Sequence, residues 1–198
     1  MQAGYAWSTE RRIVGGSLLL HIEVDDLSRH AVRALLAKHL VDMYATSPPG
    51  SVHALDLTGL SDPAVTAWTI WDGETLLGCA ALKELTVVEG EIKSMRTSAV
   101  ARGRGVAARL LAHVLDEARQ REYVRVSLET GSEDFFAPAR RLYMRHGFVA
   151  CPPFGDYTAD PNSNFFALAL DGPTDLIPVR QGSCRDQRSA TEMRSDGP

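Results

Sequence analysis

Residues 96–111, RTSAVARGRGVAARLL, place two glycines and four arginines at the start of an apolar helix pattern. The first N–H groups of a helix have no partner within the helix, and the helix dipole is positive at that end. Gly103 and Gly105 let an anion approach the main chain closely. The stretch therefore predicts a site for a phosphate-bearing ligand. The residues assigned to it are Arg102, Gly103, Arg104, Gly105, Val106, Ala107 and Ala108.

Two sequence templates fit this loop. Gly103, Gly105 and Ala108 satisfy G-x-G-x-x-A, the fingerprint of dinucleotide-binding folds, which makes NAD one candidate ligand. That fold needs a buried, almost wholly apolar strand directly before the first glycine. Here the preceding segment EIKSMRT alternates polar and apolar residues, and SAVAR intervenes. The second template, Arg/Gln-x-x-Gly-x-Gly/Ala, is met by Arg102, Gly105 and Ala107 and is favoured by this context.

The second template resembles the pyrophosphate loop of the GCN5-related N-acetyltransferases (GNAT), which bind acetyl-coenzyme A (acetyl-CoA). The strand pattern EIKSMRT before the loop and the segment ARRLYMRHGF at 139–148 match this family as well. The resemblance extends over roughly residues 17–170. Within the family, the sequence is similar to a large bacterial group of small-molecule N-acetyltransferases. This resemblance implies transfer of an acetyl group from acetyl-CoA to a primary amine of a small molecule, or of a peptide, by direct attack in a ternary complex. The alternative is an acyl-CoA sensor without catalytic activity.

Acetyl transfer to an amine needs a base for the amine and a proton for the leaving thiolate. In the family a tyrosine in the late helix motif commonly points at the sulfur of coenzyme A, so the resemblance implies that Tyr143 is the acid. Glu91 lies eleven residues before Arg102, and it resembles the base of the histone-acetylating branch. A half-buried carboxylate can have its pKa raised toward neutrality. The alternative for Tyr143 is a tyrosine packed in the core, and the alternative for Glu91 is a solvated glutamate at the end of a strand.

The resemblance implies further cofactor contacts. Met95, Arg96 and Thr97 lie where the family's central strand pairs its main chain with the pantetheine arm. Family members often place an asparagine after the strand that follows the pyrophosphate helix, and this chain has LETGS there. Thr130 is the substitute assigned to that contact, with Glu129 and Ser132 as the other candidates.

The acceptor pocket is predicted from two loops and three cations. His53 falls between the first helices, and Phe154 lies in the loop PPFGDY near the end of the domain, where the family builds its acceptor walls. His53 is also compatible with an ordinary surface histidine. Lys93, Arg96 and Arg140 are the candidates for holding a carboxylate on the acceptor.

The composition is that of an ordinary globular domain, with 44% hydrophobic residues and a net charge of −4. We therefore expect neither nucleic acid nor a membrane as a partner. Three sparse cysteines indicate a reducing compartment, and no segment approaches the roughly 20 apolar residues of a membrane span. We expect a cytoplasmic protein without a metal site. A homodimer is implied only by the resemblance.

The elements that position these residues follow from periodicity and turn signals. Strands are predicted at 17–24, 64–71, 75–85, 91–98, 123–130, 148–153 and 163–170, with a turn at Glu89-Gly90. Helices are predicted at 28–44, 52–60, from about 105 for 17 residues, and within 132–148 up to a cap at Gly147. This order predicts an α/β (α+β) domain with one mixed, mostly antiparallel sheet of about six or seven strands and helices on both faces. The domain boundaries are a flexible leader at 1–16, the catalytic domain at 17–170 and a flexible tail at 171–198.

Overall fold

The computed structural model describes residues 20–170. The predicted leader at 1–16, the predicted tail at 171–198 and the first residues of the first predicted strand lie outside the described residues. The strands are β1 Leu20–Val24, β2 Val65–Asp72, β3 Thr75–Thr86, β4 Glu89–Thr97, β5 Arg125–Gly131, β6 Val149–Ala150 and β7 Ser163–Ala169. The helices are α1 His30–Thr46, α2 Leu57–Leu60, α3 Val106–Gln120 and α4 Ala137–Arg145, with short 3-10 turns at Pro49–Ser51, Ala99–Ala101 and Asp134–Phe136.

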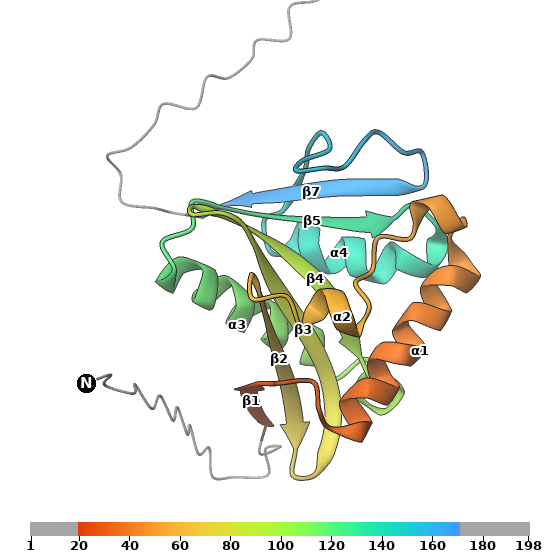
Figure 1. The fold of residues 1–198 in the computed structure, drawn as a ribbon, viewed down its shortest axis with the longest axis vertical. Coiled ribbons are helices and arrows are strands. Elements are labelled where there is room, and N and C mark those ends of the chain that lie inside the picture. Colours follow the sequence, from red (N-terminus) through yellow and green to blue (C-terminus); the bar gives the residue numbers. More distant parts are fainter. Residues whose placement is uncertain (1–19, 171–198) are drawn as a thin grey trace, which may run out of the picture.

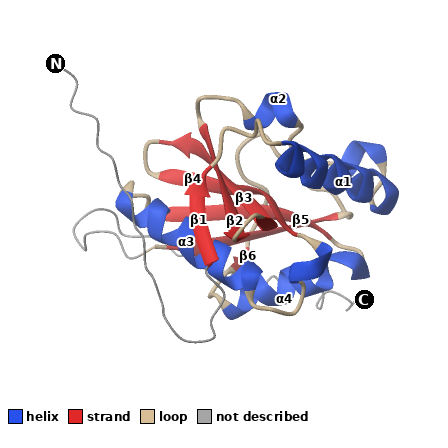
Figure 2. Ribbon diagram, turned by 90° about the horizontal axis from the view of Figure 1, so that it is seen from below, coloured by secondary structure: helices blue, strands red, loops and turns tan. Residues whose placement is uncertain are grey.

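A single seven-stranded sheet has the strand order β1-β2-β3-β4-β5-β7-β6 (Figure 1). Only the β4–β5 pair is parallel, because α3 carries the chain back across the sheet between these strands; all the other pairs are antiparallel. Helices α1 and α2 cover one face, and α3 and α4 cover the other (Figure 2). This is the predicted fold class, and the structure confirms it.

Each face of the sheet has its own apolar core. The stripe on α3, which includes Val106, Leu110 and Val114, packs against apolar residues of β2 to β5 on one face. On the other face Val32 and Leu36 of α1 pack with residues of α2, β2 and β3. Because α3 is fixed along its whole length by this burial, its N-terminus is held rigidly at one end of β4 and β5.

The predicted turn at Glu89-Gly90 is wrong, because both residues belong to β4. The hairpin turns instead at Val87 and Val88, of which Val87 is 81% exposed. Gly90 has a packing role, since a Cβ there would lie 2.7 Å from the ring of Tyr123. Residue 90 is therefore a glycine because the ring of Tyr123 leaves no room for a side chain, and not because the chain turns there.

The last predicted helix and the strand predicted directly after it are shorter than expected. The region 132–148 divides into the 3-10 turn Asp134–Phe136 and α4, which is followed at Gly147 by a left-handed residue with φ +87°, as predicted. The strand predicted at 148–153 is reduced to the two residues of β6. Pro152 and Pro153 have no N–H to donate to β7, which explains why the pairing stops there.

Strands β4 and β5 separate halfway along their length. Their parallel pairing runs from Glu89–Arg125 to Ile92–Leu128 and then ends, although β4 continues to Thr97 and β5 to Gly131 (Figure 1). A β-bulge in β4 lies at this point, where its register with β3 shifts between Lys93 and Arg96. A bulge bends its strand and increases its twist, which directs β4 away from β5. The opening between the two strands is where the predicted site residues meet.

Candidate active site

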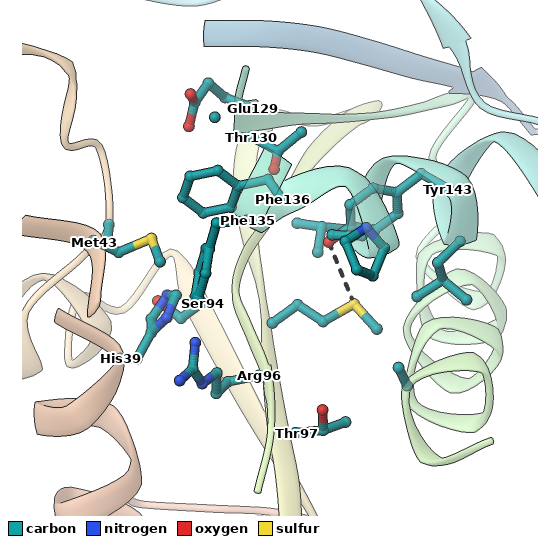
Figure 3. A pocket seen from close by; sticks show the side chains of 18 of the residues that line it. His39, Met43, Ser94, Arg96, Thr97, Glu129, Thr130, Phe135, Phe136 and Tyr143 are labelled. Atoms are coloured by element: carbon teal, nitrogen blue, oxygen red, sulfur yellow. Dashed lines mark hydrogen bonds between the residues drawn. The ribbon is translucent and has the colours of Figure 1, made fainter. Parts of the chain in front are cut away.

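One large cavity occupies the opening between β4 and β5. Its volume is about 740 Å³, and its wall comes from β4, β5, α1, α4, the segment after α1 and the loop before α3 (Figure 3). The predicted site residues in this wall are His53, Lys93, Met95, Arg96, Thr97, Arg102, Gly103, Ala107, Thr130 and Tyr143. The structure thus brings together residues from six segments of the chain.

The loop before α3 presents a row of free main-chain amides. Gly103 and Gly105 have φ of +72° and +75°, and a Cβ built on either would meet nothing within 4 Å. Within residues 20–170, no hydrogen-bond partner is found for the N–H groups of Gly103, Gly105 and the first three residues of α3. This is an open, positively polarised cradle, and it fits a diphosphate group. Arg102 adds a cationic side chain to the cavity wall.

The other loop residues have different surroundings. Arg104 points toward β2, where its Nη2 lies 3.6 Å from Oδ2 of Asp72. Val106 contributes its side chain to the apolar core and only its amide to the cradle.

Tyr143 projects from α4 into the cavity, with its ring edge against Phe148. Its hydroxyl donates to the sulfur of Met95 on β4 at 3.6 Å, the dashed contact in Figure 3. Burial raises the pKa of the phenol. A thioether is a weak acceptor, so the hydroxyl keeps its proton at neutral pH and can donate it to a stronger acceptor.

Glu91 itself lies outside the cavity wall, where it is buried in a polar cluster with Lys93 and Tyr157. One of its carboxylate oxygens accepts hydrogen bonds from Tyr157 Oη at 2.6 Å and from Lys93 Nζ at 3.1 Å. Lys93 Nζ also donates to the carbonyl oxygen of His53 at 3.0 Å and to Tyr157 Oη at 2.6 Å. The cluster ties β4 to the segment after α1 and to the loop before β7.

Glu129 of β5 is the carboxylate that lies in the cavity wall. Burial raises its pKa to about 7, while a hydrogen bond donated by Ser163 Oγ at 2.7 Å opposes the shift. A carboxyl group with this pKa exchanges protons near neutral pH. The sequence indicated Glu129 only as a candidate cofactor contact. The alternation along β5 was the available signal for its place in the cavity: Val126 and Leu128 face the apolar core, so Glu129 lies on the opposite face of the strand.

The remaining predicted acceptor residues differ in their placement. His53 lies in the wall and contacts the Tyr157 ring edge-on at 5.0 Å; burial lowers its pKa. Phe154 packs against Tyr157 and Phe165 behind the wall. Arg140 also lies outside the wall, where its Nη1 donates to the carbonyl oxygens of Gly131 and Glu133 at 2.7 and 2.9 Å and fixes the chain after β5.

No group of three or more His, Cys, Asp or Glu side chains within residues 20–170 is arranged to hold a metal ion. No helix in the same range has the length and apolar character to cross a membrane.

The mixed sheet opens beside a loop whose amides suit an anion. One cavity there contains a proton donor, Tyr143, and a titratable carboxyl group, Glu129. These features are typical of a group-transfer enzyme that uses a phosphate-bearing donor. The chain belongs to the acetyltransferase (GNAT) family, whose model matches residues 29–148. It is therefore an acetyl-CoA-dependent acetyltransferase, as the sequence predicted.

Individual relatives agree with this family. YsnE of Bacillus subtilis (strain 168), named as an N-acetyltransferase, is 51% identical over 151 residues, which cover 76% of this chain and 100% of that protein. YedL of Escherichia coli (strain K12), also named as an N-acetyltransferase, is 48% identical over 75% of this chain and 94% of its own. A Klebsiella pneumoniae structure of the acyl-CoA N-acyltransferase type aligns with a TM-score of 0.64 and 28% identity, over 78% of this chain and 99% of that one.

Proposed function

We propose that this enzyme transfers the acetyl group of acetyl-CoA to a primary amine of a small molecule, by direct attack while both reactants are bound. The observation that carries this proposal is the continuity of one cavity from the amide cradle, past Tyr143, to Glu129. Both reactants fit on one path, so the amine and the thioester can meet without a covalent enzyme intermediate. Among residues 20–170 the free cysteines are Cys79, which is buried, and Cys151, and neither lies in the cavity wall.

Acetyl-CoA supplies an activated thioester. The free amides of Gly103, Gly105 and the start of α3 bind the diphosphate, and Arg102 adds charge. Past Ile92, β4 has no ladder partner on its β5 side, so its main chain from Met95 to Thr97 is available to orient the pantetheine arm. These contacts form before the reaction and hold the carbonyl carbon in place.

Glu129 is the residue we assign as the base. Its carboxylate lies in the wall and takes a proton from the ammonium group of the acceptor, directly or through one water molecule, which leaves the neutral amine that attacks the thioester. The sequence indicated Glu91 for this role. The hydrogen bonds of Glu91 to Lys93 and Tyr157 give it a positioning role instead, because they fix the wall opposite α4.

Tyr143 is the residue we assign as the acid. Burial raises the pKa of its hydroxyl, so the group holds a proton until a strong acceptor forms nearby. A thiolate leaving group is such an acceptor, and proton transfer to it makes the reverse reaction less favourable.

Tyr143→Phe should lower kcat by about 10²-fold, the low end of the range for general acids. The Kd for acetyl-CoA should stay within about twofold, because the variant loses only a hydroxyl bonded to a thioether. Steady-state kinetics with an amine panel, followed by thiol release, measures the first quantity, and calorimetry measures the second. Tyr44→Phe on the exposed surface of α1 is the matched control.

An unchanged kcat in Tyr143→Phe would remove this residue from the mechanism. Tight binding of acetyl-CoA without thiol release on any amine would contradict the proposed function and would favour a sensor.

A further inference from the structure

A second polar region of the cavity lies on the α1 side, and acetyl transfer as described above does not use it. Ser94 Oγ and His39 Nδ1 are buried there, and neither atom has a hydrogen-bond partner within residues 20–170. Both residues lie in the cavity wall, and each is only 9% exposed. Buried polar atoms are nearly always paired, so two orphaned atoms beside one cavity are hydrogen-bonding groups that a ligand can use.

The backbone at Ser94 supports this interpretation. Ser94 lies in the β-bulge of β4 and has a φ of +49°, a left-handed conformation that is unfavourable for residues other than glycine. Such strained residues persist where the surrounding structure enforces them, and they cluster at ligand sites.

Arg96 supplies a cation beside these two atoms. Its Nη2 donates to Asp42 of α1, three residues after His39, so this face of the helix lies over β4. No hydrogen-bond partner is found, among the described residues, for the other N–H groups of the guanidinium. Figure 3 shows His39, Ser94 and Arg96 on one side of the cavity and Tyr143 on the other.

Arg96 is the buried cation of this region. It shares Asp42 with Lys38, whose Nζ lies 3.3 Å from Asp42 and whose side chain is 63% exposed. His39 adds no charge, because burial and the nearby Arg96 lower its pKa to about 4. The remaining N–H groups of Arg96 can therefore pair with a ligand that carries a negative charge.

The other two predicted carboxylate ligands are already occupied. The three N–H groups of the Lys93 ammonium are matched by three acceptors, on His53, Glu91 and Tyr157. Arg140 is bonded to main-chain carbonyls outside the wall.

The geometry points to an acceptor amine that carries a carboxylate, which Arg96 binds together with Ser94 Oγ and the ring of His39. This inference rests on the proposed function. It narrows the acceptor to small amino acids, with the amine directed toward Glu129 and the carboxylate toward α1. The planar guanidinium suits a carboxylate because its N–H groups match both oxygens.

The test compares amines that differ only in this charge. The common amino acids, β-alanine and γ-aminobutyrate are assayed as acceptors, each beside its primary amide. We expect the best acid to exceed its amide in kcat/KM by roughly 10- to 100-fold, the value of one or two hydrogen bonds to a charged group. In Arg96→Gln this ratio of acid to amide should fall to near one, because only the acid uses the guanidinium. Arg119→Gln, at an exposed site on α3, should keep the wild-type ratio.

A second variant protects the test against misfolding of Arg96→Gln. Ser94→Gly removes the hydroxyl and favours the left-handed backbone, so it should fold at least as stably as the wild type. Its ratio of acid to amide should fall several-fold.

Equal rates for acids and amides in the wild type, or a ratio that survives in both variants, would overturn the carboxylate site and leave the proposed function intact. If no amine is acetylated, the proposed function fails, and calorimetry with the same acids in the presence of coenzyme A decides the site separately. Binding that is lost in Arg96→Gln would support the site, and absence of binding would overturn it.

Discussion

Glu129→Gln is expected to lower kcat/KM for the best amine by about 10²- to 10⁴-fold, the usual contribution of a general base. Glutamine keeps the size of the side chain and can still accept the hydrogen bond of Ser163, but it cannot take a proton. In the wild type the pKa of Glu129 is raised to about 7, so the carboxylate predominates only above that pH. The kcat/KM of the wild type should therefore rise as the pH increases through about 7 and then level off, and this rise should be absent in the variant.

Two further glutamine variants complete the experiment. Glu74→Gln, at an exposed position in the β2–β3 turn, is the control for the substitution itself. Glu91→Gln tests the sequence-based assignment of the base. Near-wild-type activity of Glu129→Gln together with a large loss in Glu91→Gln would return that role to Glu91.

Replacing Gly103 and Gly105 together by alanine should raise the Kd for coenzyme A by about 100-fold. A Cβ at either position meets no protein atom within 4 Å, so the protein has room for the methyl groups. We expect each methyl group to shield the neighbouring amides from a bound diphosphate. The loss of two hydrogen bonds to a charged group costs about 3 kcal/mol, which corresponds to this change. Isothermal calorimetry with coenzyme A measures it.

Gly73→Ala is the matched control for the glycine pair. Gly73 has a φ of +57° in the β2–β3 turn, and a Cβ there also meets nothing within 4 Å. The backbone strain is therefore similar in kind, about 1–2 kcal/mol for each left-handed alanine, without a ligand nearby. A Kd within about twofold of the wild type in the double variant would show that the loop does not bind the diphosphate.

The sequence predicted those features that depend on neighbouring residues. The glycines at 103 and 105, the apolar stripe of α3 and the cap at Gly147 are local signals, and the structure has a helix or a left-handed residue at each. The boundary of β4 was wrong, because Gly90 serves the distant ring of Tyr123, which no local pattern reveals.

The chemistry of the acceptor side depended on contacts that are distant in the sequence. Lys93 was predicted to hold a substrate, but Tyr157, 64 residues later in the chain, accepts a hydrogen bond from its ammonium group. The availability of Arg96 likewise follows from the packing of α1 over β4. The raised pKa of Glu129 follows from its burial in the folded domain. Residue types and spacing identified the donor side of the cavity, whereas the acceptor side required the fold.

A crystal structure of the enzyme with coenzyme A tests the central claim most directly. We predict that the diphosphate oxygens accept hydrogen bonds from the amides of Gly103, Gly105 and the first turn of α3, and that the sulfur lies within hydrogen-bonding distance of Tyr143 Oη. A diphosphate bound away from this loop, or a sulfur on the far side of β4 from Tyr143, would contradict the account.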